Sequence, residues 1–152
     1  MKILVVYYSR TGNTEKIGNE IAKILKADTE QIIDKKDRSG SIGWVVAGKD
    51  GMGKKLTKIE TVKKDPAKYD LVIVGTPVWV NMTPAVRTYL RKFKGKFKLT
   101  AFYCTKGGSN ANIFPDMEEE SGSKAKTTME ILDKEIKEDS YKEKVKNFTS
   151  QL

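Results

Sequence analysis

Five short apolar runs recur along the chain, separated by longer stretches of mixed polarity. They cover residues 3–8, 30–33, 71–75, 99–104 and 128–132, of which the second and the fifth are the weaker ones. The runs are continuous rather than alternating, which is typical of strands that are buried on both faces of a sheet. The pattern therefore predicts five buried strands.

Helical periodicity fills the intervals between these runs. Apolar residues recur at helical spacing in three groups: Ile17, Ile21, Ile24 and Leu25; Val86, Tyr89, Leu90 and Phe93; and Tyr141, Val145, Phe148 and Leu152. Side chains able to cap a helix precede them: Asn13 or Thr14, then Thr83 followed by Pro84, then Asp139 or Ser140. Weaker patterns predict further helices at about 41–50 and 111–121.

The alternation of strands and helices predicts an α/β fold. We expect one domain over residues 1–152, with a doubly wound five-stranded parallel sheet and helices on both faces. In such sheets ligands bind beyond the carboxyl ends of the strands. A site is therefore expected among residues 9–14, 76–82 and 105–110, which follow the first, third and fourth strands.

Residues 9–14, Ser-Arg-Thr-Gly-Asn-Thr, lie between the first strand and the first helix. Their backbone N–H groups belong to a helix N-terminus, three hydroxyls add donors, and Gly12 allows close approach of the backbone. The composition predicts a phosphate site built largely from neutral groups. The alternative is an ordinary hydroxyl-capped helix start.

The other two segments favour a flat ring beside that phosphate. Trp79 follows the third strand, either as a lid on the core or as a stacking platform for a conjugated ring. Gly107 and Gly108 follow the fourth strand and expose backbone groups that can read the edge of a heteroaromatic ring. Together the three segments predict a phosphorylated aromatic cofactor.

Two glycine-rich segments, 43–50 and 48–55, come close to the pattern G-x-x-x-x-G-K-[ST]. Both lack the final hydroxyl that would hold magnesium, and neither follows a convincing buried strand. We therefore do not expect a nucleotide-hydrolysing P-loop.

Composition narrows the chemistry. The chain has 29 Lys and Arg against 20 Asp and Glu, a net charge of +9, which favours acidic partners or simply a solvated lysine-rich surface. It has no histidine, the commonest general base and metal ligand. The single cysteine, Cys104, excludes an internal disulfide and is expected to be a small core residue. With no leader pattern and no run of the ~20 apolar residues that a membrane span needs, we expect a cytoplasmic location.

The chain resembles a short-chain flavodoxin along its whole length. The family's phosphate loop, [ST]-x-T-G-x-T, is matched by Ser9, Thr11, Gly12 and Thr14, and Trp79 has the family's spacing from Gly75. The resemblance implies FMN, a sheet order of 2-1-3-4-5, and an isoalloxazine ring between residues 76–82 and 104–111. The implied cofactor-binding residues are Ser9, Arg10, Thr11, Gly12, Asn13, Thr14, Thr76, Pro77, Val78, Trp79, Val80, Asn81, Thr105, Lys106, Gly107 and Gly108. No catalytic residue or metal ligand is expected.

The chain departs from the family in three places. Many flavodoxins follow the tryptophan with Gly-Asp or Gly-Asn, whose glycine peptide flips to hold the flavin semiquinone, whereas this chain has Val80 and Asn81. A β-branched valine tolerates a positive φ poorly. Residues 105–111 lack the tyrosine that often covers the outer flavin face. Finally, flavodoxins are usually acidic, whereas this chain has a basic stretch with no acid between its members: Arg87, Arg91, Lys92, Lys94, Lys96 and Lys98.

Two functions follow from the resemblance. The first is an electron carrier that passes electrons between protein redox partners, which the basic surface predicts to be acidic, such as a ferredoxin-like protein or a reductase. The second is an NAD(P)H-dependent quinone or flavin reductase of the same fold, whose open flavin face would admit a nicotinamide or a quinone. A nucleic-acid-binding module is disfavoured, because the lysines are spread among acids and no groove with interleaved aromatics is evident.

Overall fold

The computed structural model describes residues 1–36 and 54–152, and its centre is one parallel sheet. The order is β2-β1-β3-β5-β6, which corresponds to 2-1-3-4-5 when only the parallel strands are counted. A two-residue strand, β4, pairs antiparallel with the end of β3. The strands are β1 (Ile3–Tyr7), β2 (Asp28–Gln31), β3 (Leu71–Trp79), β4 (Asn81–Met82), β5 (Thr100–Lys106) and β6 (Ala125–Leu132). The predicted doubly wound α/β fold and strand order are confirmed.

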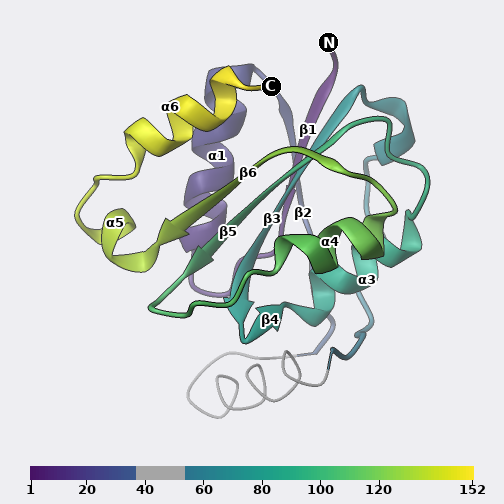
Figure 1. Ribbon diagram of the computed structural model, residues 1–152. Helices are drawn as coiled ribbons and strands as arrows, with labels where there is room; N and C mark the ends of the chain where they lie inside the picture. Colours follow the sequence, from purple (N-terminus) through teal and green to yellow (C-terminus); the bar gives the residue numbers. More distant parts are fainter. Residues whose placement is uncertain (37–53) are drawn as a thin grey trace.

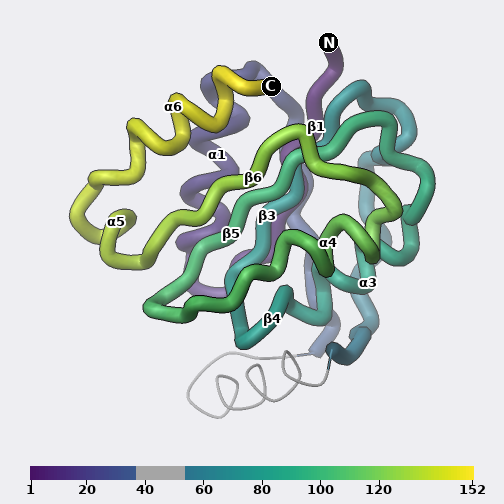
Figure 2. The backbone as a smooth tube through the Cα atoms, viewed as in Figure 1, coloured from purple at the N-terminus to yellow at the C-terminus, as the bar shows by residue number. Residues whose placement is uncertain are grey.

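Helices cover both faces of the sheet. Figure 1 shows α1 and α6 together on one face and α3 and α4 together on the other, and the tube in Figure 2 follows the chain from each strand to the next helix. The helices are α1 (Asn13–Leu25), α3 (Pro84–Lys92), α4 (Phe114–Ser121), α5 (Asp133–Lys137) and α6 (Lys142–Ser150), with a 3-10 turn at Pro66–Lys68. Both termini lie at the end of the sheet where β1 begins (Figure 1).

Strand β1 shows why the apolar runs are continuous. Leu4 and Val6 pack into the core under α3 and α4, whereas Val5 and Tyr7 pack into the core under α1 and α6. Both faces of the strand are buried, so no polar position interrupts the run.

The strands next to the site are longer than the sequence predicts. Beyond Gly75, β3 continues to Trp79 by pairing with β5 as far as Pro77 and with β4 at its end. Strand β5 likewise continues to Lys106. Residues 76–79 and 105–106 were expected as loops after the apolar runs, but pairing with neighbouring strands makes them extended. β4 and α5 were not expected, because two and five residues carry too little pattern.

The capping predictions are confirmed in one helix and wrong in two. The Thr83 hydroxyl caps α3 by accepting from the Val86 N–H, and Pro84 opens the helix. Gly12 is the N-cap of α1 and Tyr141 that of α6, and no side chain caps either end. The helix predicted at 41–50 and the segment 43–50 lie outside the described residues, as does most of 48–55.

Candidate cofactor site

The three segments predicted to form a site meet at one cavity of about 390 Å³. It opens at the carboxyl edge, by which we mean the edge of the sheet where the parallel strands end. The lining residues come from four parts of the chain: Arg10, Thr11, Asn13 and Thr14; Pro77, Val78 and Trp79; Thr105, Lys106, Gly107, Gly108 and Ser109; and Asp133. We call it the carboxyl-edge cavity.

The start of α1 supplies donors to this cavity. Asn13 and Thr14 line it and are the first two residues of the helix, which no side chain caps. Gly12 turns the chain into the helix with φ 99°, a conformation that glycine adopts without strain. First-turn N–H groups have no acceptor within a helix, and the helix dipole adds positive charge there. This end of α1 therefore fits an anion such as a phosphate.

Hydrogen bonds from β5 hold the start of α1 in place. The Thr14 hydroxyl, which was expected as a cap, instead hydrogen-bonds the Thr105 hydroxyl at 2.8 Å. The Tyr103 hydroxyl donates to the Thr14 carbonyl at 2.9 Å. Both side chains of β5 thus tie the start of α1 to the sheet, and Thr14 is only 1% exposed.

Two glycines make room for Tyr103. A Cβ on Gly75 would lie 2.0 Å from Cζ of the Tyr103 ring, and one on Gly18 would lie 2.6 Å from its hydroxyl. The sequence analysis used Gly75 only as the end of a strand. A glycine is needed at this position because of the Tyr103 ring, which lies 28 positions later in the chain. No local sequence pattern could indicate this need.

Trp79 lies mainly in the core. It is 5% exposed, and its ring meets the Tyr8 ring edge-on with centroids 5.6 Å apart. It also contributes to the cavity wall. Trp79 was expected to cover the core or to stack on a cofactor ring. Most of its side chain packs in the core, and the stacking role stays a prediction.

The chain reverses direction at Val80, between Trp79 and Asn81. Val80 has φ 73° and is 57% exposed. A β-branched side chain in this left-handed region costs on the order of 1–3 kcal/mol. The sequence analysis noted that valine tolerates this conformation poorly, and the fold nevertheless imposes it.

The β5 side of the cavity carries an ion pair between a buried lysine and a partly exposed glutamate. Lys106 is almost fully buried, and its Nζ lies 3.0 Å from a carboxylate oxygen of Glu130 on β6. Gly107 and Gly108 follow at the cavity wall. The pair partly neutralises the one lysine that the sequence analysis had placed at the site.

Two lining residues are not among the implied cofactor-binding residues: Ser109, which lies within the predicted segment 105–110, and Asp133, which lies outside all three predicted segments. Asp133 begins α5, and its carboxylate accepts a hydrogen bond from the Asn13 amide at 3.3 Å. Asp133 comes 120 residues after Asn13, so only the fold brings it to the cavity. Ser109 directly follows the predicted glycine pair and could have been included from its position.

Five of the predicted residues do not line the cavity: Ser9, Gly12, Thr76, Val80 and Asn81. Their polar groups have partners nearby. The Ser9 hydroxyl accepts from the Gly12 N–H, the Thr76 hydroxyl donates to the Pro77 carbonyl, and the Asn81 side-chain oxygen accepts from the Met82 N–H.

The basic stretch does not form one surface. Arg87 is 1% exposed and is held by Asp116 and Glu120, and Arg91 pairs with Glu120. Lys94, Lys96 and Lys98 are exposed in the segment that joins α3 to the start of β5. They therefore lie at the opposite edge of the sheet, which we call the amino edge. Arg87 is therefore not part of the basic surface, whereas Arg91 is exposed but paired with Glu120.

Cys104 is a core residue, as predicted. It is fully buried, and burial raises the pKa of its thiol to about 12, so it stays protonated at neutral pH. Within residues 1–36 and 54–152, no group of three or more Cys, Asp or Glu side chains could hold a metal ion. In the same part of the chain, no helix combines the length and apolar character that a bilayer crossing requires.

Comparison with known sequences identifies the family. A profile of the family described as flavodoxin matches residues 2–148, nearly the whole chain. The chain belongs to the flavodoxin family. The predicted family is thereby confirmed, and with it FMN, the cofactor of this family.

Solved structures agree on the fold. A flavoprotein from Lactobacillus acidophilus, solved in complex with FMN, has a TM-score of 0.73 at 23% identity, covering 90% of this chain and 97% of that one. The two-electron reduced flavodoxin of Megasphaera elsdenii has a TM-score of 0.53 at 16% identity, covering 98% of this chain and 96% of that one. At these identities the likeness shows the fold alone.

One curated relative carries an enzyme's name. It is the NAD(P)H dehydrogenase (quinone) of Chromohalobacter salexigens, 32% identical over 98 residues. The match covers 62% of this chain and 48% of that protein, so the chain spans about half the length of this relative.

Proposed function

We propose that this flavodoxin binds FMN in the carboxyl-edge cavity and carries single electrons between protein redox partners. The observation that carries the proposal is the shared cavity. The uncapped start of α1, the Trp79 side chain and the Gly107–Gly108 backbone all border it. A phosphate, a flat ring and a ring edge would each meet suitable groups there.

In this proposal the residues of the chain bind and orient the cofactor, and FMN supplies the redox chemistry when bound. The Thr11 hydroxyl and the first-turn N–H groups of Asn13 and Thr14 would hold the phosphate. Thr105 would orient the Thr14 hydroxyl, since the two are hydrogen-bonded. Trp79 would contact the ring with the part of its side chain that faces the cavity.

The lack of histidine supports a carrier, because a carrier needs no side chain as proton donor or acceptor. We further propose acidic protein partners and a cytoplasmic location, from the net charge and the single cysteine. Partners would approach at the carboxyl edge, close to the cofactor.

A second candidate is an FMN-dependent NAD(P)H:quinone or flavin reductase. The name of the Chromohalobacter relative favours it. The lack of an aromatic residue in 105–111 favours it too, since an uncovered flavin face would admit a nicotinamide or a quinone.

Flavin binding is tested first with the purified protein. We expect a flavin absorption spectrum, or quenching of FMN fluorescence when FMN is added to flavin-free protein. If neither is seen, both candidate functions fail. If FMN binds, a steady-state assay with NADH or NADPH and a quinone separates them, because rapid turnover contradicts a pure carrier.

Thr11→Val tests the phosphate site. Loss of a hydrogen bond to a charged group costs about 1.5–3 kcal/mol, so the Kd for FMN should rise roughly tenfold to a hundredfold. The Kd for riboflavin, which lacks the phosphate, should stay within about twofold. Thr128→Val is the matched control, because Thr128 is an exposed residue of β6 that does not line the cavity. An equal loss for FMN and riboflavin would place the phosphate elsewhere.

A further inference from the structure

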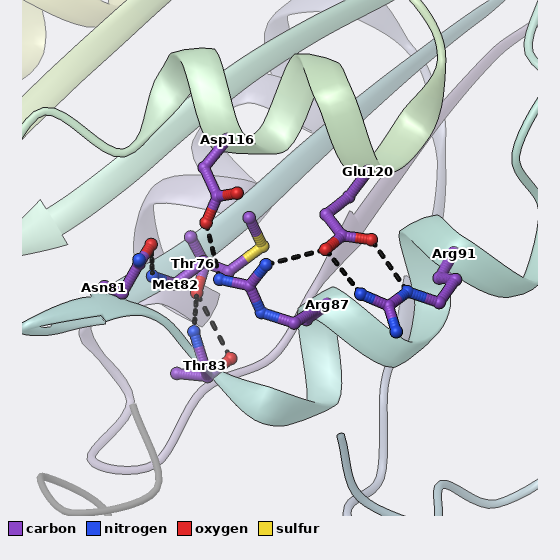
Figure 3. Close-up of polar contacts among 8 residues, drawn as sticks. All are labelled: Thr76, Asn81, Met82, Thr83, Arg87, Arg91, Asp116 and Glu120. Atoms are coloured by element: carbon purple, nitrogen blue, oxygen red, sulfur yellow. Dashed lines mark hydrogen bonds and ion pairs between the residues drawn. The ribbon is translucent and has the colours of Figure 1, made fainter. Parts of the chain in front are cut away.

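Helices α3 and α4 are joined by four charged side chains. The Arg87 guanidinium donates to Glu120 through Nη1 at 2.7 Å and to Asp116 through Nη2 (Figure 3). Arg91 donates to the two oxygens of Glu120 at 2.9 and 2.7 Å. Two positive and two negative charges thus balance. We call these four residues the α3–α4 ion cluster.

The cluster joins the two helices that follow two of the segments that border the cavity. Helix α3 follows residues 76–83, and Arg87 lies one turn into it. Helix α4 follows residues 107–113, and Asp116 lies in its first turn. The Arg87–Asp116 contact therefore joins the bases of the two segments between which the flavin ring is expected.

Threonine hydroxyls extend this connection to the end of β3. The Thr76 hydroxyl accepts from the Thr83 N–H and hydrogen-bonds the Thr83 hydroxyl, both at 3.2 Å (Figure 3). Thr83 in turn caps α3. A continuous set of polar contacts therefore runs from α4 through Arg87 and α3 to the strand that carries Trp79.

The way Arg87 is bound argues against a purely local stabilising role. It is 1% exposed, and its Nε has no hydrogen-bond partner among the described residues. Its two terminal nitrogens bind two different carboxylates. This arrangement lacks the paired hydrogen bonds of a bidentate contact with a single carboxylate. A buried pair of this kind adds little stability over an apolar contact. What it does provide is a defined separation of the two helices.

We propose that Arg87, with Asp116 and Glu120, is a positioning group that sets the distance between the two segments flanking the flavin ring. This inference rests on the proposed function, because it concerns the ring half of the FMN site. The phosphate half lies on α1, on the other face of the sheet, and does not touch the cluster.

The test separates the two halves of the site with two probes. Riboflavin reports the ring half by fluorescence quenching, and inorganic phosphate reports the start of α1 by amide NMR shifts of residues 12–14. For Arg87→Met and for Asp116→Asn we expect the riboflavin Kd to rise roughly tenfold, with the phosphate Kd within about twofold of the parent value.

Glu118→Gln is the matched control, because it changes a carboxylate of the same helix that does not reach α3. Glu118 binds Lys124 and the Ala125 N–H at the start of β6. Its riboflavin Kd should match that of the parent. A control loss as large as that of Asp116→Asn would assign the effect to α4 in general and overturn the proposal.

Amide hydrogen exchange in the flavin-free protein gives a readout that needs no cofactor. Exchange of residues 76–83 and 107–113 should speed up at least tenfold in Arg87→Met, and not in Glu118→Gln. If Arg87→Met does not fold, Asp116→Asn decides alone. Unchanged riboflavin affinity in a folded variant overturns the positioning role and leaves the proposed function intact. A parent protein that binds neither FMN nor riboflavin overturns both.

Discussion

The two edges of the sheet differ in the side chains that they carry. At the carboxyl edge, the cavity is lined by hydroxyls, amides and glycines, and the buried lysine there, Lys106, is paired with Glu130. At the amino edge, Lys94, Lys96 and Lys98 are exposed in one segment around Gly95. These three lysines therefore contribute positive charge at the edge opposite the predicted cofactor site, where Arg10 and Asp133 also line the cavity.

The two edges are far enough apart for salt to screen charges at one edge from the other. Strand β5 alone has seven residues, which spans roughly 20 Å between the two edges. The Debye length at physiological ionic strength is only about 8 Å. Lysines at the amino edge thus contribute little to attraction at the cavity, and net charge alone says nothing about where a partner docks.

The largest expected effect tests the close packing of the carboxyl edge. Gly75→Ala forces a methyl group against the buried Tyr103 ring and should destabilise the protein by about 3 kcal/mol. Gly95→Ala, at the amino edge, meets no atom within 4 Å and suffers only from its φ of 78°, so about 1 kcal/mol is expected. Urea unfolding measures both. Equal losses would mean that the two edges are packed alike.

The next effect concerns acid stability. Hydrogen bonds from Arg91 lower the pKa of Glu120, and those from Arg87 add to this against the opposing effect of burial. Because its pKa is lowered in the folded state, ionised Glu120 stabilises the protein above the ordinary pKa of 4.5. This stabilisation is lost as the pH falls below that value. Glu120→Gln should therefore cost about 2 kcal/mol at pH 7, and this cost should shrink as the pH falls through the lowered pKa.

The amino-edge counterpart is Asp70, whose pKa is lowered by a hydrogen bond from the Lys2 N–H and which also pairs with Lys98. It is exposed to solvent, so Asp70→Asn should change the pH dependence of unfolding much less. Urea titrations at several pH values measure both variants. A larger pH effect for Asp70→Asn would contradict the ranking.

A smaller effect tests backbone strain beside the cavity. Val80→Gly removes a β-branched side chain at φ 73° and should stabilise the protein by about 1 kcal/mol, after allowing for the entropy of glycine in the unfolded chain. Lys26, at φ 51°, ends α1 at the amino edge and is unbranched, so Lys26→Gly should gain less. Thermal unfolding compares the two. A loss of stability in Val80→Gly would show that the turn is not strained.

The smallest effect is expected from the amino-edge lysines. Replacing Lys94, Lys96 and Lys98 together by Gln should leave the FMN Kd within about twofold at all salt concentrations. Arg10→Gln, at the cavity wall, should raise the FMN Kd several-fold and weaken its salt dependence. Fluorescence titrations from low to high salt measure both. A salt-dependent loss in the lysine variant would show that charge acts across the whole sheet.

The sequence alone predicts the five parallel strands, the main helices between them and the hydroxyl-rich segment 9–14. Continuous apolar runs indicated strands with two buried faces, and residues 9–14 carry their donors within six consecutive positions. Thr83 could also be assigned as a cap, because its partner is only three residues away. Each of these features depends on neighbours along the chain, so local pattern was sufficient.

The contacts between residues on different strands and helices could not be predicted from the sequence. Asp133 reaches the cavity from the far end of the chain, and the ring of Tyr103 requires Gly18 and Gly75 to lack side chains. The sequence places Arg87 in a basic stretch and Trp79 at a possible stacking position, yet both side chains are buried. Their surroundings are set by strand pairing and helix packing between distant segments, and no local periodicity encodes those contacts.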